Sequence, residues 1–363
     1  MSILIKNPQL IATFNGKDEI LRDQSIFIEN NLIKDIDTAV QLTRKYRIDE
    51  IVDATDKIVL PGFINNHHHL FQGLFRNVPL LQNKPIQKWI AIMCALTKSH
   101  TNDSVYYAAQ INLAELMLSG CTTTSDLMYI FPNNQNTLFE SNIQSAHDIG
   151  IRFYSYRGSI LKQKNNLFPD EISQTEDEIL DHTEKMIKKY NKDENLMLKI
   201  GAGPCTLFST NKKIIKKCVE LKTKYNILLQ THVSESVWEN NYCKKYYNKT
   251  PTLYLTDLEF CGKNTSFVHF IYPTKRDMAA VFKQKTNIIH CPISNARGEA
   301  VAPITELLQK NINVGIGVDG SAGNDSSNIL TELRFARTLQ GVRKSRTYLD
   351  NYQSFKLGNV NGA

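Results

Sequence analysis

Short apolar runs separated by polar turns occupy the first 57 residues. The runs lie in "SILIKNP", "QLIATF", "QSIFIENNLIKDID" and "DEIVDATDKIVLPG". The asparagine pair in "ENNLI" lies between two of them and predicts a hairpin, because asparagine tolerates the left-handed backbone of a tight turn. Residues 1–57 are therefore expected to form a small β unit.

From residue 58 onward the pattern changes to a short apolar strand, a polar loop and a longer amphipathic helix, repeated along the chain. The predicted strands are 58–66, 121–128, 152–159, 196–202, 227–232, 266–270, 287–290 and 314–319. In the segments between these strands, apolar residues recur at intervals of three and four residues, as on one face of a helix. The alternation implies parallel strands with right-handed crossovers. Residues 58–363 are thus predicted to be an α/β domain, a (β/α)8 TIM-like barrel, with an open doubly wound sheet as the alternative.

Composition excludes several classes of protein. The chain has 363 residues, of which 42% are apolar and 22% charged, as in an ordinary globular enzyme. The net charge of +7 comes mostly from lysines spread along helical patterns, which argues against a nucleic-acid surface. There is no leader pattern and no long apolar run, so we expect a cytoplasmic protein with no membrane partner. The seven cysteines are scattered, which argues against a disulfide framework.

Histidines stand at or just past the ends of the predicted strands, where a barrel places its active site. They are His67, His69, His232, His269 and His290, joined by Asp319 at the end of the last strand. Alternation along a strand puts His67 and His69 on one face and His68 on the other. A single histidine is more often an ordinary loop residue than a ligand. Several imidazoles with one carboxylate, however, suit Zn²⁺ or Fe²⁺.

The order "PGFINNHHH", "THVSE", "FVHF", "HCPISN" and "VGIGVDG" resembles the amidohydrolase superfamily, in its mononuclear-metal aminohydrolase branch. Further segments, such as "HHHLFQGLFRNVP" and "GAGPCTLFS", are most similar to the branch members that deaminate 8-oxoguanine or remove ethylamine from hydroxydechloroatrazine. The resemblance covers nearly the whole chain. It implies a barrel preceded by part of a β-sandwich, whose C-terminal strands this chain would lack.

The resemblance also implies the metal and catalytic residues. His67, His69, His232 and Asp319 would bind one divalent ion, with Zn²⁺ favoured and Fe²⁺ as the alternative. Glu235 would carry a proton to a ring nitrogen, although an acid opening a helix is the ordinary alternative. His269 would orient the water, and its direct contact with the metal stays open.

A further set of residues on the same rim is expected to bind substrate: Gln72, Arg76, Trp89, Cys205, His290 and Asn295. Gln72 can donate and accept at once, which suits the amide-like edge of an oxidised purine. For Trp89 and Cys205, packing is as good an interpretation as contact with substrate.

The expected reaction is hydrolytic deamination of an aminated N-heterocycle, with 8-oxoguanine converted to urate and ammonia as the favoured example. The alternatives are a triazine-type aminohydrolase, a guanine or other purine deaminase, a nucleoside deaminase, or a metal-free scaffold of the same fold. The expected partners are a purine-like or triazine-like small molecule and further copies of the chain in a homo-oligomer.

Overall fold

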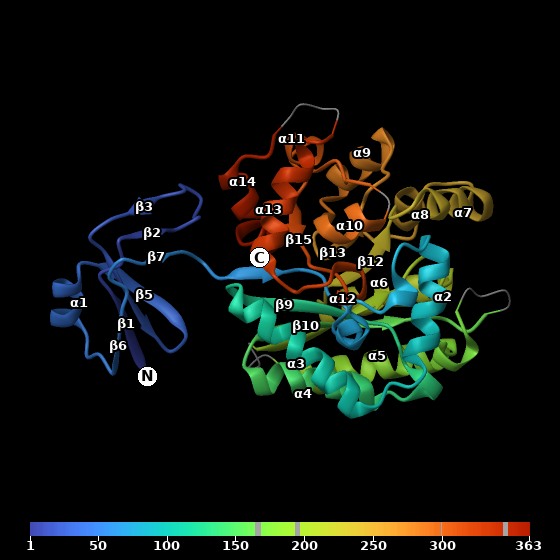
Figure 1. Ribbon diagram of the computed structural model, residues 1–363, viewed down its shortest axis with the longest axis horizontal. Helices are drawn as coiled ribbons and strands as arrows, with labels where there is room; N and C mark the ends of the chain where they lie inside the picture. Colours follow the sequence, from blue (N-terminus) through green and yellow to red (C-terminus); the bar gives the residue numbers. More distant parts are fainter. Residues whose placement is uncertain (164–167, 193–196, 299, 344–347) are drawn as a thin grey trace. The chain divides into compact units, whose positions relative to one another are not determined.

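The computed structural model describes residues 1–163, 168–192, 197–298, 300–343 and 348–363. The chain divides into two compact units, Met1–Gly62 and Phe63–Ala363. Figure 1 shows the helices and strands of both units.

The first unit contains two small sheets and one helix. The four-stranded sheet has the order β5-β4-β1-β6, and the three-stranded sheet has the order β3-β2-β7. Their bounds are β1 (Ser2–Lys6), β2 (Leu10–Ala12), β3 (Ile20–Leu21), β4 (Ser25–Glu29), β5 (Leu32–Asp37), α1 (Ala39–Lys45), β6 (Glu50–Asp53) and β7 (Ile58–Val59). Asn30 and Asn31 have positive φ between the antiparallel β4 and β5, as the hairpin prediction requires. Leu4, Phe27 and Leu42 form the buried core.

Eight parallel strands follow one another around the second unit in chain order. They are β8 (Phe63–Asn65), β9 (Cys121–Met128), β10 (Arg152–Ser159), β11 (Leu198–Pro204), β12 (Leu229–Val233), β13 (Thr265–His269), β14 (Asn287–His290) and β15 (Val314–Ile316). The backbone N–H of Asn66 donates to Ile316 O at 2.8 Å, which joins the first strand region to the last. The predicted (β/α)8 barrel is confirmed, because the strands run in one direction and their ends meet.

Helices connect successive strands. Their bounds are η1 (Leu70–Phe75), η2 (Pro79–Leu81), α2 (Ile86–Thr97), α3 (Asn102–Leu118), η3 (Pro132–Asn134), α4 (Thr137–Ile149), η4 (Asp170–Ile172), α5 (Glu176–Tyr190), α6 (Lys212–Tyr225), α7 (Val237–Tyr247), α8 (Pro251–Asp257), α9 (Lys275–Gln284), α10 (Pro292–Gly298), α11 (Ile304–Gln309), α12 (Ser321–Asn324), α13 (Ile329–Gln340), α14 (Asn351–Leu357) and η5 (Val360–Gly362). α3 packs on β9 and α4 on β10 (Figure 1). Capping boxes at Thr101 and Thr175 satisfy the first amides of α3 and α5. In the described part of the chain, every helix is too short or too polar to cross a bilayer.

The first predicted strand, 58–66, is wrong as a single strand. Ile58–Val59 pairs with β2 in the small unit, whereas Phe63–Asn65 is the first barrel strand. Pro61 has no N–H to donate to a ladder, and it separates the two pieces. The predicted strand at 196–202 begins on a residue outside the described ones, and β11 begins at Leu198.

Candidate metal centre and active site

The carboxyl ends of the barrel strands carry several residues in the left-handed region of backbone space. Ser234 follows β12 with φ 54°, His269 ends β13 with φ 74°, and Asp319 follows β15 with φ 64°. Such conformations cost non-glycine residues free energy and are concentrated at functional sites. Three of the barrel strands, β12, β13 and β15, are thus followed by sharp turns at the same rim.

Each of four histidines uses its Nδ1 atom to bind the surrounding scaffold. His69 Nδ1 lies 2.7 Å from Leu127 O, and His232 Nδ1 lies 2.7 Å from Cys205 O. His67 Nδ1 lies 2.6 Å from the side-chain oxygen of Gln230. His269 Nδ1 lies 2.8 Å from Asn295 Oδ1. A carbonyl oxygen can only accept, so these bonds place the proton on Nδ1 and leave Nε2 with its lone pair.

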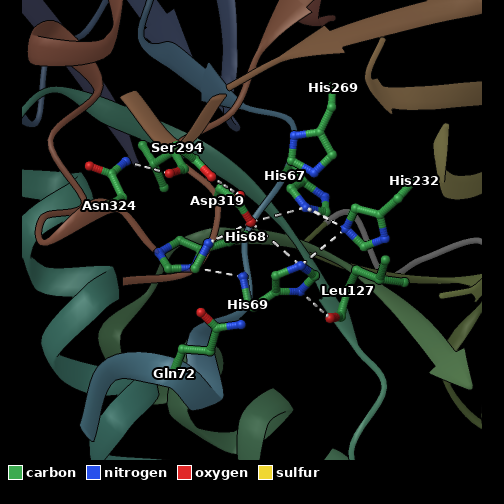
Figure 2. Close-up of polar contacts among 12 residues, drawn as sticks. His67, His68, His69, Gln72, Leu127, His232, His269, Ser294, Asp319 and Asn324 are labelled. Carbon is green, nitrogen blue, oxygen red and sulfur yellow. Dashed lines mark hydrogen bonds and ion pairs between the residues drawn. The ribbon is translucent and has the colours of Figure 1, made fainter. Parts of the chain in front are cut away.

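The Nε2 atoms with free lone pairs converge. His232 Nε2 lies 3.2 Å from His69 Nε2 and 3.3 Å from His67 Nε2. Asp319 Oδ1 lies 3.5 Å from both His67 Nε2 and His69 Nε2. Figure 2 shows these three rings turned toward Asp319. Lone pairs at this spacing repel one another unless a cation lies between them, so the donor set fits a divalent metal ion of the zinc type.

Burial keeps the imidazoles of His69 and His232 neutral. It lowers the pKa of His69 to about 3, and it lowers the pKa of His232 well below the usual range, helped by the neighbouring His67. Burial alone would raise the pKa of Asp319, but the neighbouring His67, followed by His269 and His69, holds that pKa well below the usual value. Neutral imidazoles beside a carboxylate are the protonation states that a metal requires of its ligands.

His68 lies apart from the cluster, as strand alternation predicts. Its Nε2 atom lies 2.9 Å from Ser327 Oγ, and its Nδ1 accepts the backbone N–H of His69 at 2.8 Å. Burial lowers the pKa of His68 to about 3. This ring therefore supports the loop after β8 and contributes no atom to the converging set.

Glu235 lies beside His269. Its Oε1 atom is 3.7 Å from His269 Nε2, and its side chain is 28% exposed, so it meets both the cluster and solvent. The residue follows the end of β12 by two positions, just before α7. A carboxylate placed there can exchange protons with a molecule bound next to the cluster.

A cavity of about 440 Å³ opens onto this cluster. That volume is in the range of small-molecule sites. Among the residues expected from the sequence, the lining includes His69, Gln72, Trp89, Cys205, His232, Glu235, His269, Asn295 and Asp319. Burial raises the pKa of the Cys205 thiol well above its usual range, so Cys205 offers a neutral side chain and no thiolate nucleophile.

Two residues expected to bind substrate lie outside the described lining of this cavity, Arg76 and His290. The Arg76 guanidinium makes two 2.7 Å bonds to Glu115, whose carboxylate also accepts the N–H of Ser327. His290 is fully buried, and its Nδ1 lies 3.3 Å from Asn295 Nδ2. Arg76 thus supports the loop under His68, and His290 supports the amide that holds His269.

Sequence reasoning missed several residues of the site. Gln230 holds His67, and Ser294 donates its hydroxyl to Asp319 Oδ2. Tyr129 and Phe208 line the cavity. Gln230 had a usable signal, because it stands two residues before His232 on the same face of β12. Tyr129 follows the end of β9, the rim where barrel enzymes place functional side chains.

Replacing Gln230 by methionine is expected to weaken metal binding by about 10- to 100-fold. The substitution removes the acceptor of the His67 Nδ1–H and leaves that ring free to rotate. Competition with a chelator of known affinity measures the change. Gln110→Met is the matched control, because among the described residues the Gln110 side chain donates to Ser145 O and bonds to none of the clustered histidines. Equal metal affinity in both variants would contradict the role of Gln230.

Comparisons with known proteins find similar deaminases and hydrolases. Over 343 residues, the chain is 31% identical to an 8-oxoguanine deaminase of Pseudomonas aeruginosa, covering 93% of this chain and 76% of that protein. It is 28% identical to a 5-methylthioadenosine/S-adenosylhomocysteine deaminase of Caldanaerobacter subterraneus subsp. tengcongensis, covering all of this chain and 79% of that protein. The structure superposes on the zinc complex of atrazine chlorohydrolase TrzN from Arthrobacter aurescens TC1 with a TM-score of 0.94 and 25% identity, covering 99% of this chain and 82% of that one. Residues 58–363 match the model of the amidohydrolase family, and the chain belongs to that family.

Proposed function

We propose that this protein is a metal-dependent aminohydrolase that removes the exocyclic amino group of an aminated N-heterocycle. 8-Oxoguanine, converted to urate and ammonia, is the favoured substrate. The observation that carries the proposal is the convergence of the His67, His69 and His232 Nε2 atoms with Asp319. The 31% identity with an 8-oxoguanine deaminase supports the choice of substrate.

His67, His69, His232 and Asp319 would hold one divalent ion, with Zn²⁺ favoured over Fe²⁺. A bound zinc ion acts as a Lewis acid and lowers the pKa of water from 15.7 to about 7. The scaffold bonds at Nδ1 make the imidazoles better ligands, because an N–H that donates to a carbonyl raises the basicity of the opposite nitrogen. Ser294 orients Asp319 from the other side.

The remaining residues move protons and orient the reacting groups. Glu235 would donate a proton to the ring nitrogen next to the amino-bearing carbon, which makes that carbon electrophilic. Asp319 would take one proton of the attacking water and deliver it to the departing amine, and the second water proton would return to Glu235, so that N=C–NH2 and water become HN–C=O and NH3. His269, held by Asn295 and 3.7 Å from Glu235, would orient the attacking oxygen.

Gln72, Trp89, Asn295 and Cys205 are proposed to bind the heterocycle, because they line the same cavity as Glu235 and Asp319. Arg76 and His290 are proposed as supports of the site. The resemblance further favours a cytoplasmic homo-oligomer.

The experiment that tests the proposal combines metal analysis of the purified protein with ammonia release from 8-oxoguanine, guanine, isocytosine, isoxanthopterin and hydroxylated triazines. We expect about one metal ion per chain and the fastest release from 8-oxoguanine. A folded sample that holds no metal after incubation with Zn²⁺ or Fe²⁺, and releases no ammonia from any of these compounds, would overturn the proposal.

A triazine-type aminohydrolase is the second candidate, favoured by the superposition on atrazine chlorohydrolase TrzN. The substrate panel separates the two functions. Release of an alkylamine from a hydroxylated N-alkyltriazine, faster than release of ammonia from any purine, would select the second.

A further inference from the structure

The carboxamide of Gln72 lies against the backbone of Gly320. A Cβ atom added at Gly320 would lie 1.9 Å from Gln72 Oε1, 2.3 Å from Cδ and 2.8 Å from Nε2. These are the three nearest atoms to that position. Any side chain larger than hydrogen at residue 320 therefore overlaps the whole carboxamide, in either orientation of its oxygen and nitrogen.

Backbone conformation does not explain the glycine. Gly320 has φ −74° and ψ 138°, which any residue can adopt. It is the N-cap of α12 and directly follows Asp319. The reason for glycine at this position is consequently the space that Gln72 takes.

Gln72 is held on a rigid element. It lies in η1, which packs against both α3 and α12. Asn112 of α3 donates to Leu70 O at 2.9 Å and accepts the Ser321 hydroxyl, so one amide ties the start of η1 to α12. Because the backbones on both sides are tied, an added methyl group at residue 320 would move the flexible end of Gln72 and leave the fold in place.

The Gln72 carboxamide also has unused hydrogen-bonding capacity. Gln72 is 1% exposed, yet its Oε1 atom has no hydrogen-bond partner among the described residues. Its Nε2 atom makes only a long 3.5 Å contact with Tyr129 Oη. A buried amide oxygen without a donor costs free energy, and Gln72 lines the substrate cavity, so a ligand N–H can satisfy it.

We propose that Gly320 is a positioning residue: because it has no side chain, the Gln72 amide can point at the substrate. The part of the substrate that Gln72 would bind is a lactam edge, which is the adjacent N–H and C=O of an oxidised purine or pyrimidine. The inference rests on the proposed function, because it names the part of the substrate that this cavity recognises. A ring N–H would bond to Oε1, and the ring carbonyl would accept from Nε2. Gly320 acts through Gln72, and its backbone N–H, which donates to Asp319 Oδ1 at 2.7 Å, is kept in any substitution.

Gly320→Ala is the test, measured with 8-oxoguanine and isocytosine. We expect kcat/KM to fall by about 10- to 100-fold, mainly through KM, because the lost bond serves binding. Metal content should stay at the wild-type value. Gly16→Ala is the control for a glycine-to-alanine change outside the cavity, because an added Cβ there meets nothing within 4 Å; its kcat/KM should stay within about threefold.

The double variant separates positioning from structural damage. In a Gln72→Ala background the atoms that the new methyl group would meet are gone, so Gly320→Ala should then change kcat/KM by less than about threefold. An undiminished effect in that background, or loss of metal in Gly320→Ala alone, would overturn the inference, because the glycine would then act through Asp319.

A crystal structure of Gly320→Ala shows the position of the Gln72 carboxamide, and this test does not depend on turnover. We expect the Gln72 carboxamide to be displaced into the cavity, with Asp319 unmoved. A carboxamide in its original place would overturn the inference even in an active enzyme. A wild-type protein that binds metal but turns over none of the compounds would instead overturn the proposed function.

Discussion

Replacing His69 with alanine should remove the metal and the activity together. Its Nε2 atom lies 3.2 Å from His232 Nε2 and 3.5 Å from Asp319 Oδ1, at the centre of the converging set. We expect metal content to fall from about one ion per chain to near zero. Ammonia release should fall by at least about 10³-fold, since even one lost oxyanion donor costs an enzyme about 10²–10³ in rate.

His68→Ala is the matched control for this experiment. It removes a buried imidazole from the next position, but that ring bonds to Ser327 and points away from the cluster. The control should keep its metal and melt at a lower temperature, because a buried hydrogen bond is lost. Elemental analysis of dialysed protein, ammonia release and thermal melting measure the three quantities. Loss of metal from both variants to the same extent would contradict the division of the histidine triplet.

Glu235→Gln is expected to keep the metal and lose turnover. Glutamine has the size of glutamate but cannot deliver a proton to the ring nitrogen. General acid and base catalysis contributes about 10²–10⁴ to a rate, and kcat should fall by this factor. Elemental analysis and single-turnover ammonia release distinguish this outcome from loss of the metal site. A variant with wild-type kcat would show that Glu235 is an ordinary acid at the start of a helix.

Glu239→Gln is the control for that substitution. Glu239 is four residues further along, and its Oε2 atom accepts the backbone N–H of Glu235 at 2.9 Å. Burial raises the pKa of Glu239 to about 8, so its carboxyl is mostly protonated at pH 7 and already resembles a glutamine amide. We expect metal content and kcat close to wild type. A large loss in this control would show that the Glu235 result comes from damage to the start of α7.

The arrangement of the barrel followed from the order of apolar and polar residues. The alternation of short apolar strands with amphipathic helices predicted eight parallel strands, and the structure confirms them. The error at 58–66 arose because two strands separated by Pro61 read as one apolar run. Pattern alone does not say which sheet a strand joins, since either partner buries the same side chains.

The candidate site was predictable where the backbone geometry of neighbouring residues decides which way a side chain points. Two-residue alternation after β8 separated His67 and His69 from His68. The hydrogen-bond partner of Arg76 was harder to predict, because an arginine near an active site pairs equally well with a substrate or with a protein carboxylate. Its partner Glu115 lies 39 residues away on α3, and only the packing of α3 brings it close.

The sequence by itself specified the chemical groups, the strand ends that carry them and the face on which the first two histidines lie. Folding determined which nitrogen of each ring faces the cluster with its lone pair, because the Nδ1 acceptors include the backbone carbonyls of Leu127 and Cys205. A backbone carbonyl has no residue-specific signature. Folding also brought Gly320 against Gln72 across 248 positions of the chain, a contact that depends on the packing of η1 against α12.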